Sequence, residues 1–233
     1  VFTVFKITIY LFGLDTLVSS GASQWIAYVA GATILIASLV AMTKDNLKAR
    51  LAYSTISQLS YIVLGAMLVT PLGIIGAGMH IVMHAFGKIT LFFCAGAIMV
   101  ASHKTEISQM RGLGRAMPIT FIAFTVGAMS IIGLPPFGGM WSKWYLSLGA
   151  LETEQLILLA VLMISSLLNI AYLLPIPIQA FFSKPAEDDP HPPTEFKEAP
   201  WPSVIALVIT SASCVALFFN PDALHRLLSQ LPL

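Results

Sequence analysis

The chain has 233 residues, of which 57% are hydrophobic and only 10% are charged. A soluble domain carries about 25% charged residues, so this chain has too few to cover a water-facing surface. A mean hydropathy of +0.86 and a formal net charge of +1 argue against a soluble fold, a disordered tail and a nucleic-acid-binding protein. The composition therefore predicts a protein that lies in a lipid bilayer.

Apolar stretches of the length that a bilayer requires follow one another along the chain. A membrane-crossing helix needs about 20 mostly apolar residues. Seven stretches qualify, the first of them cut short at its start: 1–13, 24–43, 47–69, 72–101, 117–150, 154–183 and 200–219. We expect an all-α polytopic membrane protein with about seven transmembrane helices.

The segments between these spans indicate their orientation. Basic residues gather in 44–50 and 102–116 and are absent from 14–23 and 70–73, which alternate with them. The positive-inside rule places the basic segments in the cytoplasm, and parity then places the acidic, Pro-rich loop at 184–199 there too.

The two ends of the chain lead to separate expectations. The chain begins at Val1 inside an apolar run, without an initiator Met, a basic leader or a cleavage site, so we expect it to be part of a longer polypeptide. In the tail at 220–233, apolar residues fall on one helical face, which predicts a short amphipathic helix along the outer interface. These residues are Ala223, Leu224, Leu227, Leu228 and Leu231.

Three ionisable residues lie on one face of the span at 72–101. His80, His84 and Lys88 follow one another at i, i+4 steps, each of which rotates about 40° around a helix. Lys88 is about 24 Å from either end of this helix and cannot reach water. The alternative is a pair of core imidazoles bonded to neighbouring helices. The buried lysine instead favours a functional stripe, whose groups exchange protons through waters.

Two prolines and two glycines interrupt the apolar run at 117–150, in the segment Leu134–Gly139. They free backbone carbonyls that hydrocarbon does not tolerate. The alternative is a surface loop between two helices, but 140–150 is too short to cross a membrane alone. We therefore expect a broken helix within the membrane, with Lys143 just beyond the break lining a hydrated cavity.

Other polar residues carry weaker expectations. Lys6, in the first span, either reaches toward the cytoplasmic surface or has a role in transport. Ser54, Ser57, Gln58 and Tyr61 form a polar stripe that helix packing explains. No carboxylate lies deep in a predicted span. Because a dehydrated sodium ion prefers oxygen ligands with a negative charge, these spans suit a proton path better than a sodium-binding site. The two cysteines of the chain match no metal-binding spacing, and we expect neither a metal nor a cofactor.

Three motifs in this order resemble the antiporter-like subunits shared by respiratory complex I, membrane-bound hydrogenases and Mrp-type sodium/proton antiporters. They are KDNLKARLAYSTISQLSY at 44–61, MHIVMHAFGKITLFFCAGAI at 79–98 and IIGLPPFGGMWSKW at 131–144. Within this family, the details at 84–98 and 105–115 are most similar to the D-type subunit of the Mrp complexes.

The resemblance implies two inverted five-helix repeats in the whole subunit, of which 24–183 would be the second. By this match, Lys88 is the central lysine of the second half-channel, and His80 and His84 bridge from it toward Lys143, the terminal charged residue. Lys6 matches the ionisable position in the helix that links the two halves, and 200–219 matches the last helix.

The resemblance also implies a function. We expect a transporter subunit without an enzyme active site, which conducts protons in a monovalent cation/proton antiporter complex. Its partners would be other membrane subunits, protons and sodium ions, and its location the inner (plasma) membrane of the cell.

Two alternatives stay open. One is a proton-pumping subunit of NADH:quinone oxidoreductase or membrane-bound hydrogenase, with the redox chemistry on other subunits. The other is a non-conducting assembly scaffold.

Overall fold

The computed structural model describes residues 1–185 and 196–231. Most of the expected loop at 184–199 and the last two residues of the tail lie outside the described residues. Within the described part, the chain is helical, and its strand-like pairing is an isolated bridge between Asn46 and Glu106. The expected all-α class is confirmed.

Eleven α-helices occur in the described ranges, with a π-helical turn at Thr8–Phe12 and 3₁₀ turns at Ile107–Met110 and Leu113–Arg115. The α-helices are α1 (Phe2–Ile7), α2 (Leu14–Ser19), α3 (Ala22–Thr43), α4 (Leu47–Met67), α5 (Pro71–Ser102), α6 (Pro118–Ile132), α7 (Gly139–Glu152), α8 (Leu156–Leu173), α9 (Pro175–Phe182), α10 (Trp201–Phe219) and α11 (Pro221–Leu228).

Four helical stretches of the described residues are long and apolar enough to cross a membrane by length and composition: Ala22–Thr43, Pro71–Ser102, Leu156–Phe182 and Trp201–Phe219. Helix α4 is as long, at 21 residues, but polar side chains interrupt its apolar sequence. Two expected spans correspond to shorter helices. The span at 1–13 corresponds to α1 and the π-helical turn, and the span at 117–150 corresponds to α6 and α7.

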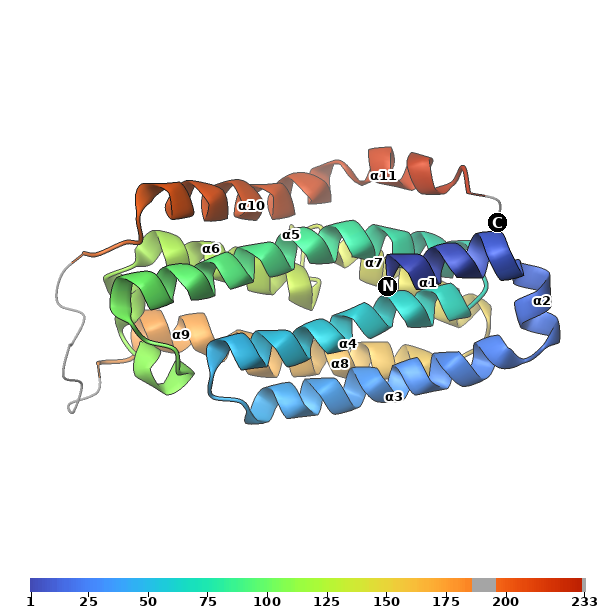
Figure 1. Cartoon of the computed structure of the whole chain (residues 1–233), viewed down its shortest axis with the longest axis horizontal. Helices are drawn as coiled ribbons and strands as arrows, with labels where there is room; N and C mark the ends of the chain where they lie inside the picture. Colours follow the sequence, from blue (N-terminus) through green and yellow to red (C-terminus); the bar gives the residue numbers. More distant parts are fainter. Residues whose placement is uncertain (186–195, 232–233) are drawn as a thin grey trace.

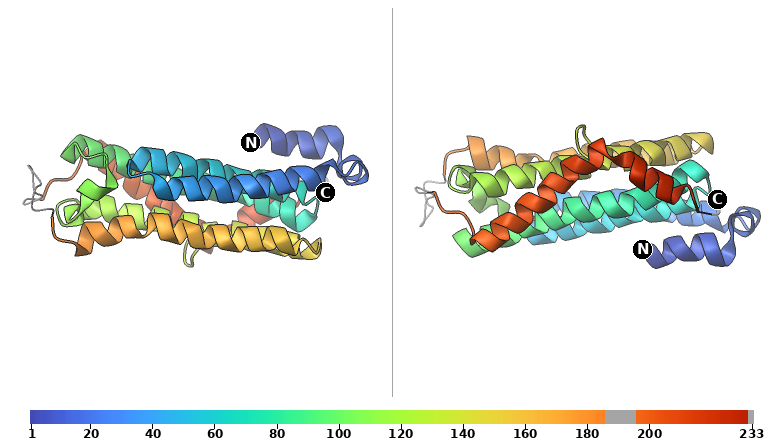
Figure 2. Two further views of the ribbon diagram at one scale, coloured as in Figure 1. Left: turned by 90° about the horizontal axis from the view of Figure 1, so that it is seen from below. Right: turned by 90° about the horizontal axis from the view of Figure 1, so that it is seen from above.

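The long helices lie side by side along one axis, and α5 is central among them (Figure 1). Helix α5 contacts α4, α6, α7 and α10, while α3 packs between α4 and α8. The views from below and above show the same elongated bundle (Figure 2). Residues on α5 are thus in reach of side chains from several neighbouring helices.

The predicted break in the chain between α6 and α7 is confirmed. Helix α6 ends at Ile132, Gly133 adopts a left-handed φ of 90°, and α7 begins at Gly139. The 15 residues of α6 and the 14 residues of α7 pack on successive parts of α5, whose 32 residues extend about 48 Å. The break therefore faces the middle of α5 and lies far from the ends of the bundle.

The predicted amphipathic tail is helical, but it does not lie across the outer end of the bundle. Helix α11 follows α10 along the length of α5 (Figures 1 and 2). Its Leu224 and Leu228 pack against Ile75 and Met79, because Gly78 leaves room for Leu228 on the surface of α5. Leu227 stays exposed. The apolar face thus covers a neighbouring helix.

The two larger apolar cores occupy the two halves of the bundle, and a smaller one comprises Ile75, Met79 and Met83. One of the larger cores includes Leu51, Leu91 and Ile132, and the other includes Ile62, Ala77 and Leu146. Along the sequences of α4, α5 and α8, buried polar residues fall between members of these two cores. A polar layer therefore lies between two apolar layers, near the middle of the bundle.

Candidate functional site

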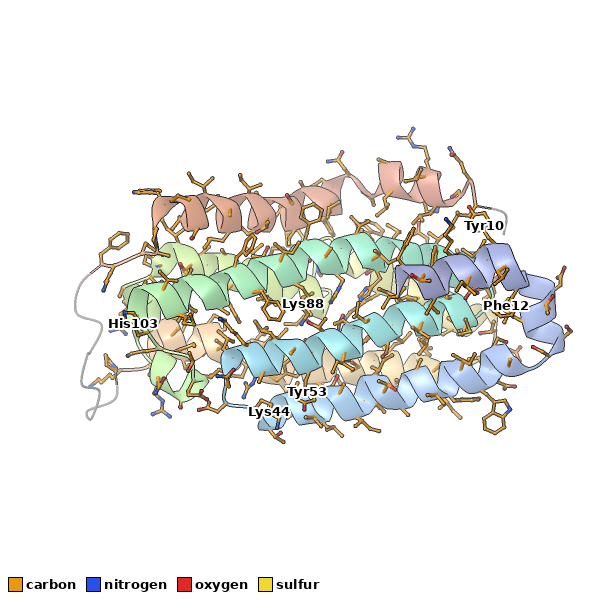
Figure 3. All side chains as sticks on the ribbon, viewed as in Figure 1. Tyr10, Phe12, Lys44, Tyr53, Lys88 and His103 are labelled. Atoms are coloured by element: carbon orange, nitrogen blue, oxygen red, sulfur yellow. The ribbon has the colours of Figure 1, made fainter. Side chains whose placement is uncertain are left out.

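Lys88 lies within this polar layer, between α4 and α5 (Figure 3). Its side chain is 5% exposed. Its Nζ donates hydrogen bonds to the Ser54 hydroxyl at 2.6 Å and to the Leu51 carbonyl at 3.3 Å. Both acceptors are neutral oxygens of α4. Helix α4 thus orients the lysine in the middle of the bundle without supplying a countercharge at these two contacts.

The two histidines of the predicted stripe form a stack on the same face of α5. The ring centroids of His80 and His84 are 5.7 Å apart, and the ring of Tyr61 stacks on His80 at 5.4 Å. Nδ1 of His80 shares a hydrogen bond with the Ser142 hydroxyl at 2.9 Å, which connects α5 to α7. Nε2 of each histidine is buried and has no hydrogen-bond partner in the described structure.

Lys143 reaches back from α7 across the break. Its Nζ donates to the carbonyl of Ile132, the last residue of α6, at 3.0 Å and to the Ser166 hydroxyl at 3.1 Å. It also lies 5.1 Å from the centroid of the Tyr61 ring. A β-carbon at Gly133 would lie 2.8 Å from Lys143 Cδ, so the glycine leaves room for this stem. The ammonium faces the negative end of the α6 dipole.

The structure thus brings four of the five predicted site residues into one layer, with Lys88 and Lys143 on either side of the stacked histidines. Lys6 is the exception. It is exposed on α1, and the contacts of the described residues do not join it to the other four. A transport role for Lys6 stays a prediction.

Polar residues of α3, α4 and α8 complete the layer. Ser38 shares hydrogen bonds with Ser57 at 2.9 Å and with Ser165 at 3.3 Å. In α8, the Tyr172 hydroxyl bonds to Ser54 at 2.8 Å and to the side-chain oxygen of Asn169. These contacts give the polar stripe of α4 partners on both neighbouring helices.

Sequence reasoning missed the contribution of α8. Ser165, Asn169 and Tyr172 are spaced i, i+4 and i+7, which places them on one face of an otherwise apolar helix. That pattern is the signal that identifies them. Helix packing alone does not account for the polar stripe of α4 either, because Ser54 bonds directly to Lys88.

Three polar atoms of two buried amides in this layer lack partners in the described structure. Both polar atoms of the Gln58 side chain and Nδ2 of Asn169 make no hydrogen bond. Buried polar groups are nearly always paired, and ordered water is the usual partner where protein atoms do not suffice. Together with the two histidine Nε2 atoms, these groups form a set of donors and acceptors suited to binding water inside the bundle.

Long apolar helices around a layer of buried lysines and histidines define an integral, multi-pass membrane protein with an ionisable centre. Membrane proteins keep such groups inside the bilayer where ions or protons pass. Residues 2–169 match the family model described as NADH:quinone oxidoreductase/Mrp antiporter, TM. The chain belongs to this family.

Two relatives show the range of the family. NADH-quinone oxidoreductase subunit N of Desulforudis audaxviator is 42% identical over 149 residues, which cover 64% of this chain and 30% of the relative. F(420)H(2) dehydrogenase subunit N of Methanosarcina mazei is 27% identical over 203 residues, or 83% of this chain and 40% of the relative. The chain thus spans less than half the length of either relative.

Solved structures share the fold. A chain of the Mrp complex from Dietzia sp. is 25% identical with a TM-score of 0.81, over 90% of this chain and 47% of that one. A chain of the archaeal membrane-bound sulfane sulfur reductase is 31% identical with a TM-score of 0.81, over 90% of this chain and 34% of that one. A chain of respiratory complex I from Thermus thermophilus is 20% identical with a TM-score of 0.82. It shares the fold over 98% of this chain and 48% of that one.

Proposed function

We propose that this chain is a proton-conducting half-channel of a multisubunit membrane complex, in which Lys88 and Lys143 exchange a proton by way of His84 and His80. One observation carries the proposal. The two lysines lie on either side of a pair of stacked imidazoles, in a polar layer between two apolar cores.

The side chains suit this chemistry. An imidazole accepts a proton on one ring nitrogen and releases one from the other, so it relays protons without moving. The unpartnered Nε2 atoms of His80 and His84 are available to water, and Nδ1 of His80 leads to Ser142, the neighbour of Lys143. A charge on one lysine disfavours a charge on the next, which favours transfer in steps.

We infer that the parent complex is a monovalent cation/proton antiporter of the Mrp type, with this chain in its D-type subunit. The motif details at 84–98 and 105–115 support this assignment. The chain would work in the inner membrane beside other membrane subunits, with protons and sodium as the transported ions and without redox chemistry of its own.

The 42% identity to a subunit N of NADH-quinone oxidoreductase favours a second candidate, a proton-pumping subunit of a redox complex. Purification of the native complex separates the two. Copurifying flavin and iron–sulfur subunits, identified by mass spectrometry, would support the redox complex. Membrane subunits and sodium-dependent proton movement would support the antiporter.

Arginine substitutions test the relay against a purely structural role. Arginine keeps the positive charge but does not release its proton in proteins. We expect Lys88→Arg and Lys143→Arg, each in the intact complex, to lower proton movement into inverted vesicles at least tenfold, with normal assembly. Lys48→Arg is the matched control, since Lys48 lies exposed at the start of α4. Wild-type transport in both buried variants would favour the scaffold alternative.

A further inference from the structure

A second series of polar groups lies between the same two lysines, and α5 contributes none of them. The groups are hydroxyls of α3, α4 and α8. In order from Lys88 to Lys143 they belong to Ser54, Tyr172, Ser38, Ser165, Tyr61 and Ser166. We propose that these hydroxyls form a second proton path, parallel to the imidazole path. This proposal rests on the proposed function, because it assumes that the two lysines exchange protons.

The first half of the path starts at Lys88. Its Nζ donates to Ser54 Oγ at 2.6 Å, and the Tyr172 hydroxyl lies 2.8 Å from the same oxygen. The Tyr172 hydroxyl also interacts with Ser38 of α3. Tyr172 is 1% exposed, and Ser54 and Ser38 are fully buried, so bulk water does not interrupt this segment.

The second half leads to Lys143. Ser38 and Ser165 lie within hydrogen-bond distance, with 3.3 Å between their oxygens. The Tyr61 hydroxyl donates to the Leu162 carbonyl at 3.4 Å and also interacts with the hydroxyls of Ser165 and Ser166. Ser166 accepts a hydrogen bond from Lys143 Nζ at 3.1 Å. Polar contacts thus extend from one lysine to the other, and Tyr61 must turn its proton from the Leu162 carbonyl toward Ser166 before it passes the proton on.

The orientation of these hydroxyls distinguishes them from ordinary helical ones. Thr55 and Ser60 of α4 and Thr33 of α3 bond to carbonyls of their own helices, four residues earlier. Serine and threonine commonly make such local bonds. By contrast, Ser38 and Ser54 bond to side chains of neighbouring helices. Local bonding would have satisfied these hydroxyls, so their shared alignment across three helices needs another explanation.

Hydroxyl groups carry protons because each one both donates and accepts. In the proposed step, Nζ of Lys88 gives a proton to Ser54, and each hydroxyl passes its own proton to the next. Lys143 is a neutral amine when the transfer starts, and it gains one proton while Lys88 loses one. Every hydroxyl ends with a single proton, so only O–H and N–H bonds form and break. The hydroxyls then rotate back before the next transfer.

Asn169 is a positioning residue for this path. Its side-chain oxygen accepts a hydrogen bond from the Tyr172 hydroxyl. That hydroxyl has one proton, so while it points to Asn169 it does not donate toward Ser38. The amide thus holds Tyr172 in an orientation that interrupts the path. When the bond to Asn169 breaks and Tyr61 turns from the Leu162 carbonyl, the path is complete.

Removal of one hydroxyl tests the second path. We expect Tyr172→Phe, in the intact complex, to lower proton transport into inverted vesicles about twofold, and His80→Gln to lower it by a similar factor. The double variant should lower transport more than tenfold, because both paths are then broken. Tyr28→Phe is the matched control. Its hydroxyl bonds to Gln155, outside the polar layer.

The outcomes separate the two proposals. If Tyr172→Phe transports like Tyr28→Phe, and the double variant transports like His80→Gln, the hydroxyl path is wrong and the imidazole relay stands. If Lys88→Arg and Lys143→Arg transport like the wild type, the proposed function fails and the hydroxyl path fails with it.

Two further tests guard against an effect on assembly. Ser38→Ala removes a path hydroxyl with a small change in volume, and Ser60→Ala is its control. We expect about twofold lower transport in the first and wild-type transport in the second, and equal rates would overturn the path.

In the His80→Gln background, Asn169→Ala should raise residual transport by releasing Tyr172. Damage to the fold does not produce such a rise, and unchanged or lower transport would overturn the role of Asn169.

Discussion

The contact between α5 and α7 at Gly76 offers a sharp test of the site geometry. An added β-carbon at Gly76 would lie 2.7 Å from the Leu146 backbone nitrogen and 3.0 Å from the Tyr145 carbonyl carbon. Both neighbours are backbone atoms, so no side-chain rotation relieves the clash. Gly96 lies on the same helix, and its added β-carbon would meet nothing within 4 Å. Gly76→Ala and Gly96→Ala thus form a matched pair.

The expected cost follows from these distances. Carbon contacts are ordinarily about 3.5–4.0 Å, so Gly76→Ala forces the two helices apart by about 1 Å. Overpacking of this kind costs about 1–3 kcal/mol. Replacing a helical glycine by alanine also contributes about 1 kcal/mol of helix propensity, but both variants share this gain. The difference in stability between them should therefore be about 1–3 kcal/mol.

The same displacement reaches the site. His80 lies one turn after Gly76 on α5, and Ser142 lies one turn before Leu146 on α7. Their hydrogen bond is 2.9 Å long, so a separation of about 1 Å breaks it. Misplacement by this amount costs up to about 100-fold in rate at a reacting centre. The bond belongs to the imidazole path alone, so we expect proton transport to fall about twofold in Gly76→Ala, as in His80→Gln, and to stay near the wild-type rate in Gly96→Ala.

Thermal unfolding of the purified complex measures the stability difference, and proton uptake by inverted vesicles measures transport. A midpoint for Gly76→Ala below that of Gly96→Ala, together with slower transport, is the expected result. If both variants unfold and transport alike, α5 and α7 are not in backbone contact at Gly76, and the geometry assigned to the His80–Ser142 bond is wrong.

Two predictions concern the ends of α6. The Glu198 carboxylate accepts hydrogen bonds from the backbone nitrogens of Ile119 at 2.7 Å and Thr120 at 3.3 Å, so Glu198→Ala should cost about 1–2 kcal/mol. Hydrogen exchange at these two amides should quicken about 5–30-fold, and unchanged exchange would contradict the cap. At the other end, Lys143→Met leaves the buried Ile132 carbonyl without its ammonium donor, so unfolding should become easier by about 1–3 kcal/mol. An unchanged thermal midpoint would show that this bond contributes nothing.

The features that follow from local geometry could be predicted from the sequence. The stripe of His80, His84 and Lys88 depends only on the repeat of an α-helix, and the break after Ile132 depends on the backbone chemistry of proline and glycine. Both are local in the chain. The structure reproduces them because no distant contact is needed to form them.

The contacts between helices could not be predicted in the same way. Ser54 and Tyr172 are 118 positions apart, and the bond between them depends on how α4 and α8 align. A hydrophobic pattern specifies which face of a helix is buried, but not its register against a neighbour. The direction of α11 could not be predicted for a related reason. Its apolar face could bind either lipid or α5, and only the surface of α5 around Gly78 decides between them.

Helix α6 connects the fold to the proposed transport. It has no side-chain N-cap of its own and no basic residue in its last turn. Glu198 supplies the negative charge at its first turn, and Lys143 supplies the positive charge at its last carbonyl. Both charges oppose the helix dipole and stabilise α6. If Lys143 releases its proton as proposed, one of these two charges disappears. The position of α6 and the protonation of Lys143 must then influence each other. The break would therefore allow α6 to move relative to α7 when Lys143 changes its protonation state.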